Sequence, residues 1–100
     1  MIVLINVFSV DPENQQRLVD ILTRATDVSV RQAKGFISAT LNRSIDGTRV
    51  TMYAQWRSLA DYQAMREDPG PRFFFEEALS IAGFEPGMYE VVRTFAPADA

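Results

Sequence analysis

The chain has 100 residues, of which 47% are hydrophobic and 23% charged, so we expect one ordinary domain over residues 1–100. This size excludes a multidomain enzyme with separate cofactor and substrate modules. Ten Lys and Arg against thirteen Asp and Glu give a net charge of -3 without a basic cluster, which argues against nucleic acid or a membrane surface as partner. A chain this short buries only about 60 to 70% of its unfolded surface, so a second subunit is expected to complete the core.

The sequence contains neither Cys nor His, and this limits its chemistry. Without Cys there are no disulfides, thiol nucleophiles or thiolate metal sites. Without His there is no imidazole base, no Ser-His-Asp triad and no imidazole ligand for zinc, iron or haem, so no metal site is expected. The five apolar residues Met1–Ile5 follow no positive segment and are too few for an export signal, which predicts a cytoplasmic protein.

The first third of the chain predicts a strand followed by a long helix. Ile2–Phe8 is short and almost continuously apolar, as in a strand covered on both faces. Asp11-Pro12 is typical of a helix start, and Lys34-Gly35 of a helix end. Between them, one helical face carries the apolar residues Leu18, Ile21, Leu22, Ala25 and Val28.

The dipeptide Asp46-Gly47 predicts a β-hairpin that joins strands over Phe36–Ser44 and Arg49–Arg57. A turn centred on this dipeptide sets the register of every cross-strand pair. The apolar pairs are then Leu41 with Met52, Ala39 with Ala54, and Ile37 with Trp56; the polar pairs are Asn42 with Thr51, Thr40 with Tyr53, and Ser38 with Gln55. One face is apolar throughout and the other is polar, and a slip of one residue would destroy this agreement.

The remaining segments predict two helices and a last strand. Ser58 begins a short helix through about Arg66, which Asp68-Pro69-Gly70-Pro71 ends. A further helix is expected over Arg72–Ala82, stopped by Gly83. Met88–Phe95 then predicts a strand, and Ala96–Ala100 a frayed tail.

The resulting order, β-α-β-β-α-β, is that of the ferredoxin-like α+β fold, a four-stranded antiparallel sheet with helices on one face. The other face of this sheet would be open in a monomer. It combines polar and apolar residues, namely Ser38, Thr40, Tyr53 and Gln55 of the hairpin with Val3, Ile5 and Val7 of the first strand. Such a mixture is poorly suited to full exposure, so we expect a homodimer in which two sheets face each other.

A pocket is predicted on the helix-facing side of the sheet. Ala39 opposite Ala54 leaves space beside Trp56, unless Leu and Phe side chains of the helices fill it. On the same face Asn6 interrupts an apolar strand, where its amide needs a partner, either a ligand or a neighbouring backbone group.

Other candidates lie near the expected helix over Arg72–Ala82. Phe73, Phe74 and Phe75 cannot all point one way on a helix, so at least one borders a cavity or the dimer contact. Arg72 and Arg93 are candidates for stabilising an anionic substrate, with a solvated or ion-paired surface arginine as the alternative for each.

These strands resemble those of the antibiotic biosynthesis monooxygenase (ABM) family. The resemblance rests on Asn6, Gly35-Phe36-Ile37-Ser38-Ala39, Asp46-Gly47 and Tyr53-Ala54-Gln55-Trp56-Arg57-Ser58, and it extends from about Ile2 to Phe95. It implies a dimeric α+β barrel. Several members of the family oxidise aromatic polyketides such as anthrones to quinones with molecular oxygen and no flavin, haem or metal.

Carried over by position, the resemblance implies Asn6, Trp56 and Tyr62 as catalytic residues. The candidate substrate-binding residues are Ala39, Met52, Ala54, Arg72, Phe74 and Arg93. Met52 stands where members often have Asn, and the absence of His sets the chain apart from haem-degrading relatives.

A cofactor-free oxygenation needs a substrate that is itself the electron donor, and the protein desolvates, orients and stabilises the substrate anion. The resemblance therefore implies a cofactor-independent monooxygenase acting on a phenolic, anthrone or quinol-type aromatic. Two alternatives remain: a non-catalytic dimeric binding module for a hydrophobic aromatic ligand, and a structural relative whose core is filled.

Overall fold

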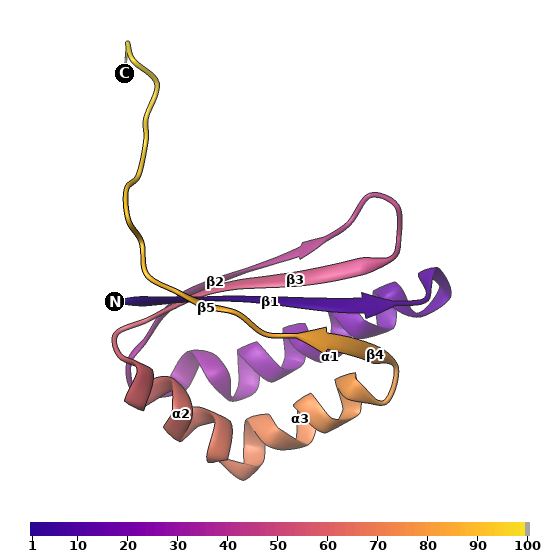
Figure 1. Cartoon of the computed structure of the whole chain (residues 1–100). Coiled ribbons are helices and arrows are strands. Elements are labelled where there is room, and N and C mark those ends of the chain that lie inside the picture. The colour runs from indigo at the N-terminus through magenta and orange to yellow at the C-terminus, as the bar shows by residue number, and fades with distance from the viewer. Residues whose placement is uncertain (100) are drawn as a thin grey trace.

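The computed structural model describes residues 1–99 and has two layers, an antiparallel sheet and a layer of helices on one of its faces (Figure 1). The strands lie in the order β2 (Phe36–Arg43), β3 (Arg49–Trp56), β1 (Ile2–Val10) and β4 (Ala82–Glu85), and the short β5 (Met88–Tyr89) also pairs with β1. The helices are α1 (Gln15–Val28), α2 (Leu59–Glu67) and α3 (Pro69–Leu79). This arrangement confirms the expected α+β, ferredoxin-like class, but the described sheet has five strands where four were expected.

The helix expected over residues 11–34 is divided into three parts. Short 3-10 turns at Pro12–Asn14 and Val30–Gln32 precede and follow α1. The predicted apolar face packs into the core, except that Val28, the last residue of α1, is exposed. Gly35 enters β2 with a φ of 86°, a backbone conformation that favours glycine.

The hairpin has the predicted register from Ser38 to Asn42, including Ala39 opposite Ala54. The prediction that Ile37 pairs with Trp56 is wrong. A bulge at Ile37 lets Phe36 pair with Trp56 instead, and the two rings pack edge to face with centroids 5.5 Å apart. Because the bulge shifts the alternation of faces, Ile37 is 48% exposed.

The hairpin turn is held by the side chain of Asp46. Its Oδ1 accepts hydrogen bonds from the Thr48 backbone N–H (3.0 Å), the Thr48 hydroxyl (2.7 Å) and the Ser44 hydroxyl (2.8 Å). These bonds stabilise the carboxylate, those from Thr48 most, and lower the pKa of Asp46 from 3.8 to about 2. Gly47 has a φ of 84°, as the predicted Asp-Gly turn requires.

The two helices after β3 are capped by side chains. The Ser58 hydroxyl accepts a hydrogen bond from the Asp61 N–H (3.2 Å), as its position predicts. Asp68 in turn accepts from the Gly70 N–H (3.0 Å), so α3 begins at Pro69 and not at Arg72. Proline suits the first position of a helix, where its missing N–H would have no partner.

The expected helix end at Ala82 and Gly83 is in fact part of β4, which pairs with the second half of β1. Gly83 lies opposite Ser9, and a Cβ at Gly83 would come 2.5 Å from the Ser9 hydroxyl oxygen. A side chain here would have to displace the Ser9 hydroxyl, and the glycine lies within a strand rather than at a helix end.

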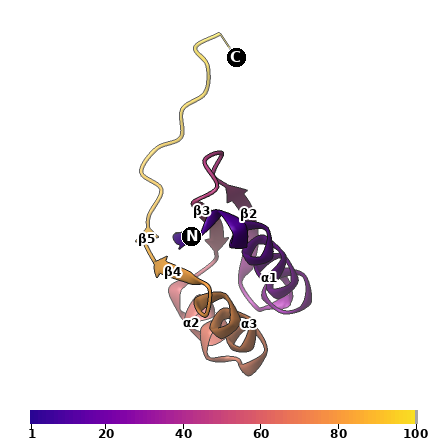
Figure 2. The ribbon, with the colours of Figure 1, turned by 90° about the vertical axis from the view of Figure 1, so that its right-hand side faces the viewer.

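The strand expected over Met88–Phe95 is confined to Met88 and Tyr89. From Glu90 on, the described chain runs away from the sheet, on the side opposite the helices (Figures 1 and 2). Val92 and Phe95 in this segment are 96% and 76% exposed. The prediction of a frayed tail over residues 96–100 falls partly on Ala100, which lies outside the described residues.

The core consists of two clusters of buried side chains between the sheet and the helices. One is built around Phe8, Leu18 and Val50, and the other around Leu4, Trp56, Tyr62 and Met65. Within residues 1–99, no helix combines the length and the apolar composition needed to cross a bilayer.

Candidate active site

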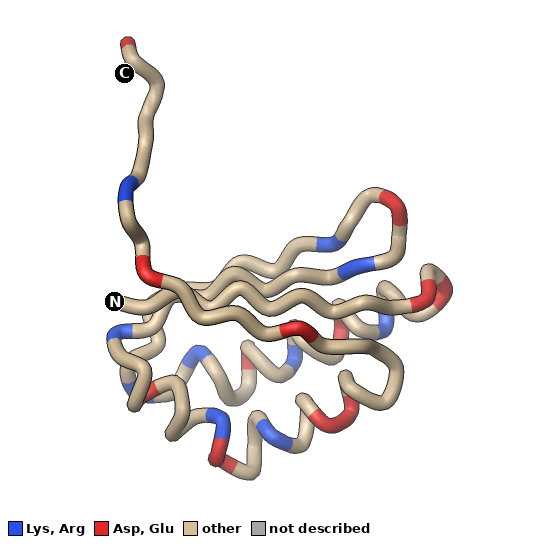
Figure 3. Tube along the Cα trace, in the orientation of Figure 1, with Lys and Arg blue, Asp and Glu red and all other residues tan. Residues whose placement is uncertain are grey.

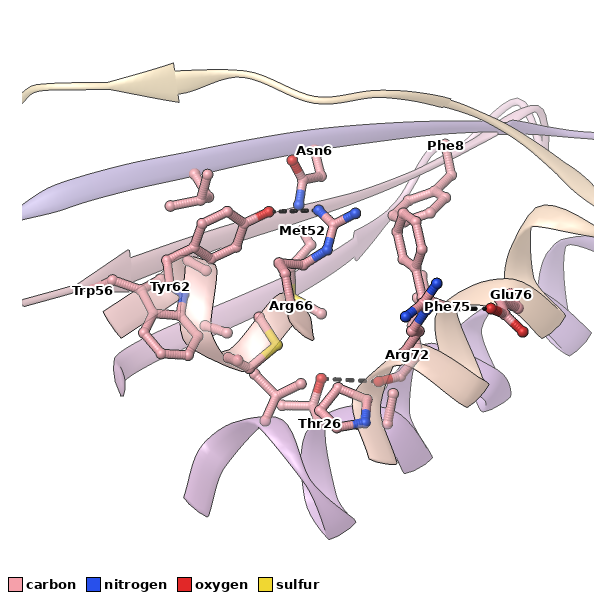
Figure 4. A pocket seen from close by; sticks show the side chains of 18 residues that line it. Asn6, Phe8, Thr26, Met52, Trp56, Tyr62, Arg66, Arg72, Phe75 and Glu76 are labelled. Atoms are coloured by element: carbon pink, nitrogen blue, oxygen red, sulfur yellow. Dashed lines mark hydrogen bonds and ion pairs between the residues drawn. The ribbon is translucent and has the colours of Figure 1, made fainter. Parts of the chain in front are cut away.

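A cavity of about 290 Å³ lies between the sheet and the helices. Leu22 of one core cluster and Met65 of the other both line it, together with side chains from β1, β2, β3, α2 and α3 (Figure 4). Its lining is mainly apolar with a few polar groups, and its volume lies at the lower end of the range for small-molecule sites. This cavity argues against the alternative of a structural relative whose core is filled.

The structure brings Asn6, Trp56 and Tyr62 to this cavity (Figure 4). Trp56 is 1% exposed, and its ring packs edge to face against Tyr62 with centroids 5.7 Å apart. Ala39, Met52 and Ala54, also named from the sequence, line the sheet side of the same cavity. The strand alternation that predicted one apolar face therefore also predicted the residues that share the cavity.

Asn6 is the polar residue of β1 that lines the cavity. Its Oδ1 is buried and, among residues 1–99, accepts no hydrogen bond. Of the two alternatives for this amide, a backbone partner is absent for the oxygen within the described chain. A buried acceptor without a donor costs about 1 to 3 kcal/mol, a cost that functional sites often carry.

The other sequence candidates differ in their placement. Arg72 lines the cavity but is largely exposed and forms an ion pair with Glu76, also on α3, at 3.5 Å. Phe74 does not line this cavity. One residue farther along the helix than Phe74, Phe75 is rotated by about 100° and takes the lining position, whereas Phe74 packs under Arg24 of α1. Arg93 lies in the segment that leaves the sheet and contacts Phe95, so the described chain does not bring it to the cavity.

Sequence reasoning missed Arg66, which lines the cavity from α2. Its Nη1 donates a hydrogen bond to the Tyr62 hydroxyl oxygen at 2.8 Å, and its guanidinium lies over the Phe75 ring, 4.3 Å from the centroid. The signal was available in the spacing, because residues four apart on a helix share a face. Tyr62 and Arg66 have this spacing, so a Tyr62 side chain directed into the cavity predicts an Arg66 side chain beside it.

Acidic and basic residues alternate over the helices and loops rather than gathering at one place (Figure 3). Among the described residues, no three Asp or Glu side chains group as metal ligands would. The polar groups of the cavity are the Asn6 amide, the Tyr62 phenol, the guanidinium groups of Arg66 and Arg72, the Thr26 hydroxyl and the Glu76 carboxylate.

The sequence matches the model of the family described as antibiotic biosynthesis monooxygenase over residues 1–77. Since this match covers more than half of the chain, the protein belongs to that family.

Two relatives share enough sequence to bear on more than the fold. Tetracenomycin-F1 monooxygenase of Streptomyces glaucescens is 44% identical over 92 residues, which are 92% of this chain and 82% of that protein. A monooxygenase from the gene ActVA-Orf6 of Streptomyces coelicolor, solved in complex with nanaomycin D, is 31% identical with a TM-score of 0.85, over 97% of this chain and 92% of that one.

A mutant of SnoaB, a cofactor-independent oxygenase from Streptomyces nogalater, has a TM-score of 0.82 at 19% identity, over 93% of this chain and 94% of that one. This likeness bears on the fold alone. Together the similar structures confirm the expected ferredoxin-like ABM architecture.

Proposed function

We propose that the protein is a cofactor-independent monooxygenase that oxidises a phenolic, anthrone or quinol-type aromatic with molecular oxygen. The observation that carries the proposal is that Asn6, Trp56 and Tyr62 line one cavity. The 44% identity to a tetracenomycin-pathway monooxygenase supports the same reaction class. We also propose a cytoplasmic location.

The reaction balances without an added reductant when the substrate supplies the electrons. For an anthrone, the ring CH₂ becomes a carbonyl. One atom of O₂ forms the C=O bond, and the other leaves as water with the two hydrogens of the CH₂. The substrate first loses a proton, and its delocalised anion passes an electron to oxygen. The protein's task is to exclude water, orient the ring and stabilise the anion.

Each residue of the site has a role in this reaction. The Asn6 amide hydrogen-bonds one substrate oxygen, and the Tyr62 hydroxyl a second. The Trp56 indole forms an apolar wall for the ring, with Ala39 and Ala54 leaving room over the sheet. No side chain of the cavity is a strong base, so the acidity of the substrate contributes much of the first step.

Oxygen uptake with a panel of anthrones and hydroquinones tests the proposal. We expect turnover above buffer with at least one of them, and a loss of at least tenfold in kcat/KM in Asn6→Ala and in Trp56→Phe. Gln63→Ala, at an exposed position of α2 that does not line the cavity, is the control and retains full activity. Full activity in both cavity variants, or no turnover with any member of the panel, refutes it.

A non-catalytic module that binds a hydrophobic aromatic is the second candidate, because the same apolar cavity suits it. Calorimetry distinguishes the two: tight binding of an anthrone without oxygen consumption selects the binding module.

We also propose that the working unit is a homodimer. The segment after β5 extends from the helix-free face of the sheet and carries the exposed apolar residues Val92 and Phe95. Tyr53 on that face is 37% exposed. Val3 was expected on the open face that the partner covers, but it pairs with Tyr89 of β5 and is already buried within the chain. Covering the remaining apolar surface requires a partner, and a second copy supplies it symmetrically.

Sedimentation velocity at micromolar concentration tests the dimer. We expect one dimeric species, and dissociation in the double variant Val92→Asp, Phe95→Asp. Ile45→Asp at the exposed hairpin tip introduces the same charge elsewhere and leaves the dimer intact. A monomeric full-length chain contradicts the proposal.

A further inference from the structure

Three charged side chains line the cavity, and two of them pair with each other. Arg72 and Glu76 form an exposed ion pair at 3.5 Å, so their charges offset one another. The third is Arg66, for which no ion pair to a carboxylate is present within residues 1–99. The cavity therefore carries one uncompensated positive charge. This charge is the Arg66 guanidinium, which lies beside apolar lining residues such as Phe75.

Aromatic rings hold the Arg66 guanidinium. Its Cζ lies 4.3 Å from the Phe75 ring centroid, 5.8 Å from that of Tyr62 and 5.9 Å from that of Phe84. Rings on α2, α3 and β4 thus surround it, and each ring face attracts a cation. A charge in such apolar surroundings interacts more strongly with an incoming anion than it would in water.

The hydrogen bonds around Arg66 leave donors available. A guanidinium has five N–H groups, and one of them donates to the Tyr62 hydroxyl oxygen at 2.8 Å. Because that oxygen accepts, the Tyr62 O–H hydrogen is directed elsewhere, and the bond from a cation makes it a stronger donor. In Figure 4 the Asn6 amide nitrogen is turned to the same side as this pair. Donors of three residues therefore face one part of the cavity.

The residue at position 52 cannot stabilise a negative charge on the substrate, so another residue of the lining has to do so. Met52 lines the cavity beside these groups, and its thioether has no N–H or O–H to donate. The stabilisation of negative charge on the substrate has to come from another residue of the lining.

We propose that Arg66, together with the Tyr62 hydroxyl, binds the deprotonated oxygen of the substrate, so that the site takes a phenol or enol as its anion. The O–H bond breaks, the proton is released to solvent, and the electron pair remains on the oxygen that Arg66 contacts. The inference rests on the proposed function for the identity of the substrate. It assigns to Arg66 the role that the sequence left open between Arg72 and Arg93.

A chromophoric phenol that oxygen does not oxidise tests this role without turnover. We would titrate 4-nitrophenol bound to the protein and follow the phenolate absorbance, with 4-nitroanisole as its neutral analogue. A cation at this distance is expected to lower the pKa of the bound phenol by about 1 to 3 units. Arg66→Gln should abolish the shift and weaken phenolate binding by about 10-fold to 1,000-fold, since one unit corresponds to tenfold. Binding of 4-nitroanisole should stay within about threefold of wild type.

Matched variants make the outcome specific. Arg66→Lys keeps the charge and should retain part of the shift, and Tyr62→Phe should reduce it. Arg24→Gln removes the same charge from a similar contact with Phe74, outside the cavity, and should leave the shift unchanged. Circular dichroism and thermal melting establish that each variant is folded.

The results separate this inference from the proposed function. A full pKa shift in folded Arg66→Gln, or an equal loss of 4-nitroanisole binding, overturns the role of Arg66 whatever the activity. A shift that depends on Arg66 in a protein that never consumes oxygen supports the inference and refutes the monooxygenase. If wild-type protein binds neither probe, both fail.

Discussion

Replacing Asn6 with leucine should make the protein more stable and inactive at the same time. The buried Oδ1 of Asn6 has no hydrogen-bond donor within residues 1–99, at a cost of about 1 to 3 kcal/mol. Leucine removes this atom, matches the buried neighbours Leu4 and Phe8 on the same strand face, and extends into the adjoining cavity of about 290 Å³. We expect a gain of about 1 to 2 kcal/mol in the free energy of unfolding. For a domain of this size, each kcal/mol raises Tm by about 4 to 8 °C.

Urea denaturation at one fixed protein concentration measures this gain, since the stability of an oligomer depends on concentration. Gln63→Leu is the control, because Gln63 is an exposed residue of α2 that lies outside the cavity and the sheet. We expect it to change stability by less than about 0.5 kcal/mol. A loss of stability in Asn6→Leu would mean that the amide is satisfied in the folded protein. Retained oxygen uptake would mean that it does not bind substrate.

Three further predictions concern the framework of the site. Trp56→Ala should cost about 3 to 5 kcal/mol in urea denaturation, because it empties a position that is 1% exposed; a cost below about 1 kcal/mol would contradict the packing. Gly35→Ala should lower Tm more than Gly47→Ala, although both glycines have a positive φ. A Cβ at Gly35 would clash with the Asp61 side chain, whereas the nearest atom to a Cβ at Gly47 is 3.4 Å away. Equal losses of Tm would refute this reasoning. Because the pKa of Asp46 is lowered in the folded protein, this carboxylate contributes to the free energy of unfolding above about pH 4, and the contribution is lost as the pH falls toward 2. Asp46→Asn should therefore make the free energy of unfolding less dependent on pH in that window. An unchanged dependence would show that the hydrogen bonds of the turn do not stabilise the fold.

The parts of the fold that the sequence predicts well are those governed by local rules. The Asp46-Gly47 turn determines the hairpin register, and the Ser58 cap determines the start of α2. The errors occur where a tertiary contact decides. Gly83 has the pattern of a helix stop, yet it lies in β4 opposite Ser9 of β1, a pairing that no local pattern reveals. The bulge at Ile37 likewise depends on Phe36 packing against Trp56.

The site shows the same division. Asn6 and Trp56 could be placed on one face because strands alternate with a period of two. Periodicity could have placed Arg66 beside Tyr62 on α2, but showing that Arg93 does not reach the cavity required the relative placement of the helices, the sheet and the segment after β5. Arg66 reaches the cavity because Phe75 of α3 and Phe84 of β4 pack around it, and these residues are distant from it in the chain.

The most direct test of the central claim is single-turnover oxidation of an anthrone by protein freed of metals with a chelator, in ¹⁸O₂. If the cavity of Asn6, Trp56 and Tyr62 is a cofactor-independent oxygenase site, one equivalent of oxygen is consumed and one ¹⁸O atom enters the quinone product. The rate then falls in Asn6→Ala. Product formation no faster than in buffer, or a rate that returns only when a metal or flavin is added, would contradict the account.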